Sequence, residues 1–396
     1  MTSARSRIPA LDALRGVAVA GIVPMNVIAF AMPAAAYINP RAFGGTDTLD
    51  TVLWALSFVL VEDKFRALFA MLFGAGIVIL IERGTLRAHY ARMAALGAIA
   101  IAHAVLVANN DVLRSYALAG LLLPLALRWR VRTLLLAAGA LMAGQLLVSG
   151  YVAFGWLRYW YAHASGMPVD LAPLAEAERR FGADPQVIAA SIARAQESLG
   201  ERLVRRTGDW SVQASAVLAS LPSTLAAMLL GMALWRNGLL ASEWPAQRSL
   251  KLALRCAVFS APPLLAMALW SWASGFAAIP TAFNALVLSA PFDLVLGVGY
   301  AALAMATLGG ATRWAAVGRM ALTNYLATSL IFAAMFAAWG LGLFGEVGRA
   351  GALGLGLMPI VGMLLWSPLW LARFRQGPAE WLWRSVAALK PLPLSR

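Results

Sequence analysis

One histidine of this 396-residue chain, His103, lies inside a long apolar segment, and a carboxylate follows it eight residues later. On a helix, His103 stands about 16 Å along the axis counted from Arg92. A neutral imidazole can accept a proton from a hydroxyl or amine, and a carboxylate such as Asp111 can orient it. Direct contact requires a break at Asn109 and Asn110, because eight residues span about 12 Å of helix. The pair predicts general-base chemistry, and the alternative is a core histidine bonded to a neighbouring helix.

The first apolar segment of the chain contains three further polar residues of interest. Asp12 and Arg15 are three residues apart, so on a helix they share a face and can form an ion pair. The pair closes the inner end of the helix, or Arg15 faces the phosphates of a cytoplasmic ligand, since guanidinium binds phosphate bidentately. Asn26 lies about 21 Å further out, beside the kink expected from Pro24. An amide at that depth needs a hydrogen-bond partner.

Other polar side chains lie in or near apolar segments, where ionisable groups are costly unless they are used. They are Glu62, Asp63, Lys64, Arg66, Asp293, Arg319 and Asn324. Each one alone is more often a helix-to-helix contact than a catalyst. The sequence contains no glycine-rich phosphate loop, no histidines at metal-binding spacing and no Gly-x-Ser-x-Gly motif. With a single cysteine, Cys256, it excludes an internal disulfide, and we expect no metal.

The elements that position these residues must be membrane helices. Hydrophobic residues make up 61% of the chain and charged residues 13%, whereas a soluble domain is about half apolar and about a quarter charged. The mean hydropathy of +0.74 excludes soluble, disordered and collagen-like proteins. The apolar runs are long and continuous, which argues against a β-barrel. We therefore predict an all-α, polytopic membrane bundle.

The runs fit about ten spans of about 20 residues each. The predicted spans are Ala10–Met32, Phe65–Ile81, Ala91–Val107, Val112–Leu127, Thr133–Ala153, Val212–Trp235, Leu252–Ser274, Phe283–Leu308, Trp314–Trp339 and Leu353–Leu371. Thr51–Ile81 would be about 46 Å long as one helix, so we expect Leu53–Val61 to form a separate outer or re-entrant helix. Asp12 and Arg15 argue against a cleaved signal peptide, so the first helix is expected to be retained.

The basic residues set the predicted orientation. With the N-terminus inside, twenty Lys and Arg residues fall on or near the inner face, and three fall in short outer loops, Arg41, Arg114 and Arg349. This bias predicts cytoplasmic termini. It explains the net charge of +14 without a nucleic-acid partner.

We expect three parts: a first membrane half at 1–154, an extracytoplasmic loop at 155–211, and a second membrane half with its tail at 212–396. The loop holds seven of the eighteen acidic residues. Its segments Pro173–Phe181 and Pro185–Arg206 predict two amphipathic helices, which form either a packed external cap or a substrate lid.

Several motifs carry a resemblance to a known family. Leu11–Gly16, Gly21–Val23 and Asn26 resemble the first helix of the transmembrane acyltransferase superfamily, which includes the heparan-α-glucosaminide N-acetyltransferases and the acyltransferase-3 proteins. Most of the chain resembles the bacterial DUF418 (YeiB-like) family. The segments that match are Lys64–Arg66, Leu68-Phe69, Leu72–Gly74, His103-Ala104, Asp111–Leu113, Tyr116-Ala117, Gly318–Leu326 and Gly377–Arg384.

This resemblance implies a multi-pass protein of the bacterial cytoplasmic (inner) membrane. It further implies transfer of an acyl group, most simply acetyl, from cytoplasmic acyl-CoA to an extracytoplasmic acceptor such as a cell-envelope sugar or a lipid-linked molecule. Asn26 matches an asparagine of the heparan enzymes. The catalytic histidine that follows that asparagine has no counterpart between Asn26 and Asp50, and the first helix lacks the histidine of the acyltransferase-3 proteins. His103 would take over the role.

The expected site has three groups of residues. The catalytic group has His103 as the general base, Asp111 as its orienting carboxylate and Asn26 as a hydrogen-bond donor to the thioester carbonyl. The CoA phosphates would be held by Arg15, Arg319, Arg83 and Arg92. The acceptor mouth would be lined by Glu62, Lys64, Arg66 and Asn324.

Two other functions stay open. The first is a secondary transporter, because five spans, a loop and five more spans suit an inverted repeat, with Pro24 and Pro222 in comparable places. The second is a non-catalytic envelope protein. The partners expected in every case are membrane lipids, and the sequence leaves open whether the protein forms a homodimer.

Overall fold

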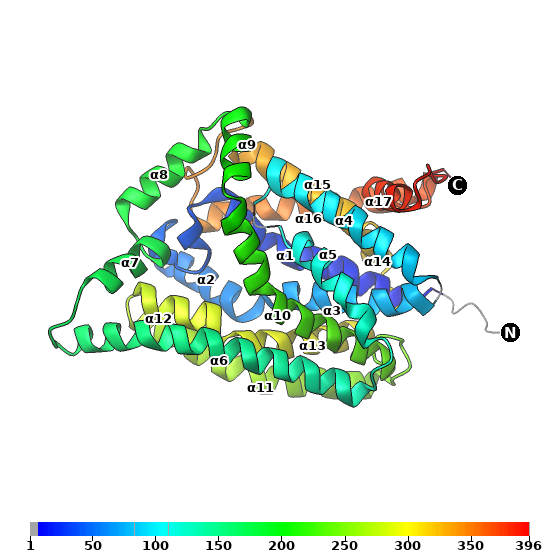
Figure 1. Ribbon diagram of the computed structural model, residues 1–396, viewed down its shortest axis with the longest axis horizontal. Helices are drawn as coiled ribbons and strands as arrows, with labels where there is room; N and C mark the ends of the chain where they lie inside the picture. Colours follow the sequence, from blue (N-terminus) through cyan, green and yellow to red (C-terminus); the bar gives the residue numbers. More distant parts are fainter. Residues whose placement is uncertain (1–6, 83, 110, 396) are drawn as a thin grey trace.

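The computed structural model describes residues 7–82, 84–109 and 111–395. In this part, the regular secondary structure is helical apart from one isolated bridge between Phe374 and Ser395. Eight segments of these residues are long and apolar enough to cross a membrane, so the predicted all-α membrane fold is confirmed (Figure 1). They are α1 (Pro9–Ala31), α2 (Thr48–Leu60) with α3 (Lys64–Glu82), α4 (Leu86–Leu106), α6 (Val131–Ala164), α10 (Trp210–Arg236), α11 (Ala246–Ala273), α13 (Ala290–Thr307) and α16 (Arg349–Arg373).

Three further apolar stretches are helical but shorter than a membrane span. They are α5 (Leu113–Leu122) with η3 (Leu123–Ala126), α12 (Ala278–Phe283) with the π-helical turn η4 (Asn284–Leu288), and α15 (Ala321–Phe336). The predicted span Val112–Leu127 is therefore a short helix. The predicted span Trp314–Trp339 is divided into α14 (Thr312–Arg319) and α15, because Met320 leaves the helical conformation between them.

The predicted break before the second span is confirmed. After α2, the chain makes a turn at Val61–Asp63, and Asp63 adopts a left-handed φ of 58°. This conformation ends a helix, because a side chain in a continuing right-handed helix does not adopt it. Lys64 then begins α3 in a new direction, and the charged turn lies between the two helices.

The outer loop folds into three helices rather than the two predicted. They are α7 (Ala172–Phe181), α8 (Pro185–Ala195) and α9 (Leu199–Gly208), which together we call the cap. The expected second helix is interrupted because Ser198 begins α9 with a capping box: its hydroxyl accepts from the Glu201 N–H at 3.3 Å, and the Glu201 carboxylate accepts from the Ser198 N–H at 2.9 Å. Helix α6 also runs past residue 154 to Ala164.

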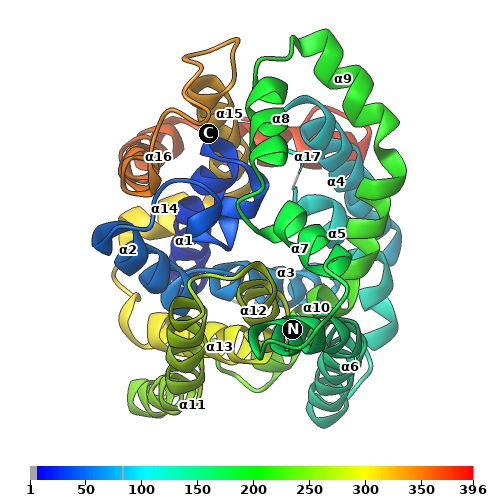
Figure 2. The ribbon, with the colours of Figure 1, turned by 90° about the vertical axis from the view of Figure 1, so that its left-hand side faces the viewer.

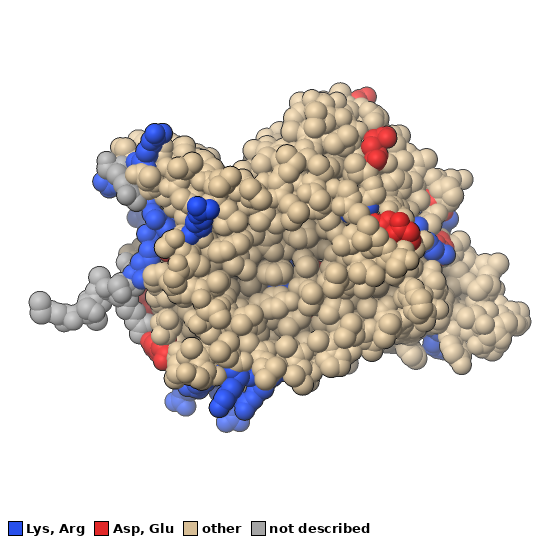
Figure 3. All heavy atoms as spheres, turned by 180° about the vertical axis from the view of Figure 1, so that it is seen from behind, with Lys and Arg blue, Asp and Glu red and all other residues tan. Residues whose placement is uncertain are grey.

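Most of the long helices run along the horizontal direction of Figure 1. The start of α1 and the last helix, α17 (Pro378–Ala388), lie at its right-hand end, while α7 and α8 lie at the left. Two short 3-10 turns, η1 (Ala34–Tyr37) and η2 (Pro40–Ala42), follow α1. On the face in Figure 3, Lys and Arg gather mainly at the end that carries α17, and Asp and Glu are more numerous toward the cap.

Helices α3 and α10 pack closely at the centre of the bundle. A Cβ on Gly231 of α10 would lie 1.8 Å from the carbonyl oxygen of Met71 in α3, and a Cβ on Gly74 would lie 2.1 Å from that of Met228. The two glycines thus let the backbones touch directly, as small residues do in membrane bundles. This packing sets the position of the polar turn at the start of α3.

Candidate functional site

A cavity of about 860 Å³ lies between the membrane helices and the cap. We call it the outer cavity. Its walls come from α1, the turn between α2 and α3, the connection between α4 and α5, and α10, while the cap contributes residues of α7, α8 and α9. Figure 2 is drawn from the cap end and shows these elements around the centre of the molecule. Its volume is typical of a small-molecule site.

Helix α1 turns the face that carries Asn26 toward this cavity. Ile22 and Ala29, four residues before and three after Asn26, line the cavity with it, as helical periodicity requires. The Asn26 amide makes no hydrogen bond to any residue that the structure describes, and the residue is only partly buried. The partner expected for this deep amide is therefore a molecule that enters the cavity.

The turn between α2 and α3 brings an acid and an ion pair into the cavity wall. The Arg66 Nε donates to the Asp63 Oδ1 at 2.8 Å, and the Arg66 carbonyl accepts from the Tyr116 hydroxyl at 3.0 Å. Glu62 also lines the cavity, and the residue is 4% exposed. No described residue forms a hydrogen bond or an ion pair with its carboxylate. Lys64 and Arg349 interact electrostatically with this carboxylate, which belongs to the cavity wall.

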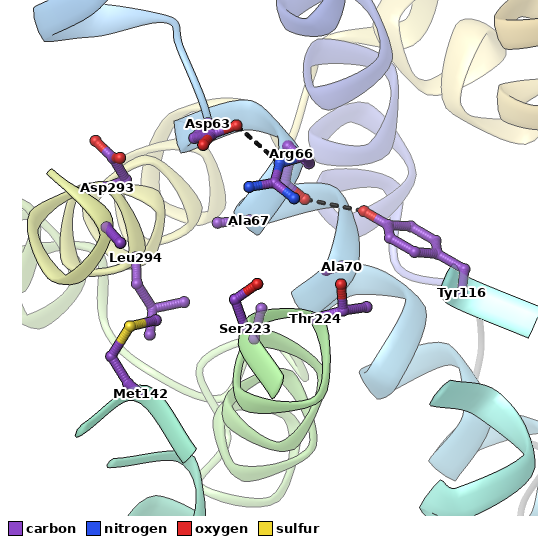
Figure 4. A pocket seen from close by; sticks show the side chains of 12 residues that line it. Asp63, Arg66, Ala67, Ala70, Tyr116, Met142, Ser223, Thr224, Asp293 and Leu294 are labelled. Carbon is purple, nitrogen blue, oxygen red and sulfur yellow. Dashed lines mark hydrogen bonds and ion pairs between the residues drawn. The ribbon is translucent and has the colours of Figure 1, made fainter. Parts of the chain in front are cut away.

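A small polar annex of about 50 Å³ adjoins the floor of the outer cavity (Figure 4). Asp63, Arg66, Tyr116 and Thr224 line both spaces. In Figure 4, Arg66 lies between Asp63 and Tyr116, and Ser223 and Thr224 of α10 point toward them. The annex extends the polar surface of the cavity floor toward α13.

Lys64 is the member of the charged turn that does not line the cavity. Its ammonium contacts the Asp293 Oδ1 at 2.7 Å and donates to the carbonyl of Phe58. Both charged side chains are almost completely buried. Lys64 therefore holds the start of α3 against α13 and the end of α2, and it is separated from the predicted acceptor mouth.

His103 and Asp111 are in contact, as the spacing predicted for a broken helix. Helix α4 ends three residues after His103, and the returning chain places the Asp111 Oδ2 at 3.2 Å from the His103 Nδ1. Asn110, part of the predicted break, lies outside the described residues. The other oxygen of Asp111, Oδ1, accepts from the Tyr325 hydroxyl at 2.8 Å and from the Leu113 N–H at 2.9 Å. The carboxylate thus contacts the imidazole of α4 through one oxygen and ties α15 to the start of α5 through the other.

The His103 and Asp111 side chains are shielded from the outer cavity. Both imidazole nitrogens are buried, and neither has an aligned hydrogen-bond partner among the described residues. Asp111 contributes to the cavity wall, but its side chain is 0% exposed and His103 is not part of that wall. Arg206 of α9 donates to three carbonyls at the end of α4, those of Ala104, Val105 and Val107, at 3.2, 2.9 and 3.3 Å. An acceptor can touch the imidazole only after this region opens.

The arginines expected to hold a donor lie at the opposite end. Asp12 contacts the Arg15 Nη1 at 3.2 Å and the Arg7 Nε at 3.0 Å. Arg7 also interacts electrostatically with Arg15 and Arg384, and Arg384 does so with Arg92. We call Arg7, Arg15, Arg92 and Arg384 the inner arginine cluster.

Two other arginines were expected to take part in donor binding. The Arg319 Nη2 donates to the carbonyl of Arg375 at 3.4 Å. Arg83 lies outside the described residues. Arg7 and Arg384 were not predicted as site residues, because their proximity depends on how α17 folds back onto α4.

Asn324 has a structural environment. Its amide donates to the Val317 carbonyl and to the Ser367 Oγ, both at 3.1 Å, and accepts from the Trp366 Nε1 at 3.0 Å. It thereby joins α14, α15 and α16 and does not line the outer cavity. The adjacent start of α15 is capped by Glu380 of α17, which accepts from the N–H groups of Leu322 and Thr323.

The cap supplies the group of functional residues that sequence reasoning missed. Five of its arginines line the outer cavity: Arg180, Arg194, Arg202, Arg205 and Arg206. In the sequence they belong to mixed-charge helices that resemble solvated surface. The available signal was the excess of arginine in α9, where Arg202, Arg205 and Arg206 recur at helical spacing.

The arrangement can bind an amphipathic or polar molecule of moderate size, donate a hydrogen bond from Asn26, and accept a proton at Glu62. Basic residues line the cavity on the cap side, and a second basic cluster lies at the inner end of α1. Within the described residues, no group of three or more His, Cys, Asp or Glu side chains is placed to hold a metal ion.

Comparisons with known proteins identify a relationship but no activity. Residues 234–390 match the family described as "Protein of unknown function (DUF418)". The chain is 29% identical over 409 residues to a protein of Escherichia coli (strain K12) named "Uncharacterized protein YeiB", and the match covers 95% of each chain. It is 27% identical over 418 residues to "Uncharacterized protein YxaH" of Bacillus subtilis (strain 168), covering 100% of this chain and 98% of that one. No solved structure matches.

Proposed function

The chain is a DUF418 (YeiB-like) membrane protein, and we propose that it is an acyl-CoA-dependent acyltransferase whose acceptor binds in the outer cavity. The donor enters from the cytoplasmic side, and the acceptor is an extracytoplasmic molecule such as a cell-envelope sugar or a lipid-linked molecule. The protein belongs in a bacterial cytoplasmic membrane, with both termini inside.

The observation that carries this proposal is the open amide of Asn26 in a cavity that Glu62 also lines, with a carboxylate that makes no hydrogen bond among the described residues. Asn26 and Arg15 are eleven residues apart on α1, which is about 16 Å. A donor whose phosphates bind the inner arginine cluster can therefore extend a long thioester arm along α1 toward Asn26. One helix then aligns the donor-binding end with the acceptor-binding cavity.

The reaction assigns a role to each group. Asn26 donates a hydrogen bond to the thioester carbonyl and stabilises the negative charge that develops on its oxygen. A base removes the proton of the acceptor hydroxyl or amine, and the acceptor bonds to the acyl carbon. The bond between this carbon and sulfur then breaks, and the protonated base returns the proton to the departing CoA thiolate. Glu62 can act as this base in the present conformation. His103, oriented by Asp111, can act once the cap region has opened.

The test is incubation of the purified protein with labelled acetyl-CoA, with water as the acceptor until another is known. We expect specific binding and slow thioester hydrolysis, and a loss of rate of about 10²–10³ in Asn26→Ala, as for loss of an oxyanion donor. Asn237→Ala, in a turn outside the cavity, is the matched control. Binding of acetyl-CoA should persist in Asn26→Ala.

Two variants assign the base. If Glu62 is the base, Glu62→Gln loses activity and His103→Gln retains it, and the reverse result identifies His103. A folded protein that neither binds nor cleaves acetyl-CoA would refute the acyltransferase. Uptake of a metabolite into proteoliposomes, without acyl turnover, would identify the secondary transporter instead.

A further inference from the structure

The roof of the outer cavity contains a buried arginine, Arg202, whose side chain makes no hydrogen bond or ion pair among the described residues. Arg202 belongs to α9 and is 7% exposed. Burial lowers the pKa of Arg202, and the nearby Glu197 opposes this effect only in part. A buried guanidinium is costly unless an anion accompanies it.

Neighbouring groups do not supply that anion. Glu197 is engaged by Arg205, which donates to both of its oxygens at 2.9 and 3.0 Å. Arg206 is occupied by the carbonyls at the end of α4, and burial, with Arg202 and Arg205 beside it, lowers the pKa of Arg206 to about 10. Three arginines of one helix therefore share a space that contains too little negative charge.

The other walls of the cavity indicate what kind of molecule would carry the anion that Arg202 requires. Arg194 of α8 also lines the roof, and no described residue pairs with it. Below the cap, apolar side chains of α1, α10 and α15 line the same cavity, among them Ile22, Val217 and Phe336. The cavity thus offers cations beneath the cap and apolar side chains of α1, α10 and α15 further in, beside the polar floor formed by Glu62, Asp63 and Arg66.

We propose that the outer cavity binds a phosphate-bearing molecule, with its phosphate held by Arg202 and Arg194 beneath the cap and an apolar portion lying along α1, α10 and α15. A planar guanidinium suits phosphate because it donates two parallel hydrogen bonds. This inference adds a chemical class to the acceptor of the proposed function. The site itself does not depend on acyl transfer.

The test is isothermal titration of the whole protein in an uncharged maltoside detergent, without acyl-CoA. The probes are dihexanoyl phosphatidic acid, glycerol 3-phosphate and dihexanoylglycerol, which separate the phosphate from the apolar chains. We expect phosphatidic acid to bind more weakly as salt increases, and dihexanoylglycerol not to bind. Tighter binding of phosphatidic acid than of glycerol 3-phosphate supports a lipid source. Equal binding of the two supports a soluble phosphate and overturns the apolar half of the proposal.

Variants locate the binding site. Arg202→Gln should weaken phosphatidic acid binding about tenfold or more, since a hydrogen bond to a charged group is lost. Arg179→Gln is the matched control, because Arg179 is an exposed cap arginine outside the cavity. If Arg202→Gln does not fold, Arg194→Gln on the exposed end of α8 provides the measurement. Failure of both phosphates to bind, or equal affinity in Arg202→Gln, Arg194→Gln and wild type, would overturn the proposal.

Discussion

The ionisable residues of the charged turn at the start of α3 have two different roles: some line the outer cavity, and one forms a buried ion pair. Glu62 and Arg66 line the outer cavity, whereas Lys64, between them in sequence, forms a buried ion pair with Asp293. A buried pair contributes little net stability compared with apolar side chains of the same size, but removing one partner leaves an uncompensated charge. Lys64 and Asp293 therefore depend on each other.

We predict that Lys64→Met destabilises the protein by about 3–5 kcal/mol, the usual cost of breaking a buried pair. The double variant Lys64→Met with Asp293→Leu should recover most of this loss, because no buried charge then remains. Denaturant unfolding in detergent micelles measures both effects. Equal unfolding midpoints for Lys64→Met and the wild type would show that the pair is not a structural contact.

Glu380 lies in α17, outside the membrane helices, and its titration makes the stability of the folded protein depend on pH. Burial raises the pKa of Glu380 above its ordinary value of 4.5, although hydrogen bonds from Thr323 and Leu322 oppose the shift. The folded state therefore holds the proton more tightly than the unfolded chain does. Its stabilising contribution is complete below the unfolded pKa and is lost as the pH rises through the folded pKa.

The variant Glu380→Gln is the reference for this effect, because a glutamine side chain does not titrate. From pH 4 to pH 7, the unfolding free energy of the wild type should fall relative to that of Glu380→Gln, by at most about 1.4 kcal/mol per pH unit. Unfolding curves of the two proteins at matched pH give this difference. A difference that stays constant over this range would contradict the raised pKa.

Sequence spacing was sufficient to predict local relations between residues but not which side chains face the cavity. The spacing showed that His103 could contact Asp111 only if the helix broke between them, and the structure has both the end of α4 and the contact. The different orientations of Lys64 and Arg66 depend on how α3 packs against α10 and α13, which no local pattern contains. The cap arginines were missed for the same reason, since only the folded cap turns Arg202 inward.

At the scale of helices, the sequence predicted the existence of the spans better than their ends. Continuous apolar runs located the predicted spans on helices, but the span at Trp314–Trp339 is divided at Met320, where Glu380 caps α15 from a distant segment. The second cap segment was divided by the Ser198 capping box, a local signal present in the sequence.

The contact between α3 and α10 yields an element-scale prediction. Gly231→Ala places a methyl group against the Met71 carbonyl oxygen, and neither backbone can move away without loosening the bundle. We expect a loss of about 1–3 kcal/mol or more in detergent unfolding. Gly354→Ala in α16 is the matched control: its new methyl group meets no atom within 4 Å, and alanine favours a helix by up to about 1 kcal/mol. Equal effects of the two variants would refute the close packing.

At the scale of the whole molecule, the two basic clusters lie in different places relative to the membrane helices. The inner arginine cluster lies at the end with α17, while α7 and α8 of the cap lie toward the opposite end and α9 lies at the upper edge (Figure 1), with Arg206 against the C-terminal end of α4. Lys and Arg in short connections favour the cytoplasmic side, whereas long loops escape this rule. The cap arginines therefore do not oppose the orientation that the short loops indicate.

Cysteine labelling tests this orientation in intact cells. In a Cys256→Ala background, Ser165→Cys lies at the exposed end of α6 beside the cap, and Gly309→Cys lies exposed in the connection after α13. A membrane-impermeant maleimide should label Ser165→Cys at once and Gly309→Cys only after the membrane is opened, because short basic connections are held on the cytoplasmic side. The opposite pattern would place the outer cavity on the cytoplasmic side. The proposed route, with acyl-CoA entering at the inner arginine cluster and the acceptor entering beneath the cap, would then be wrong.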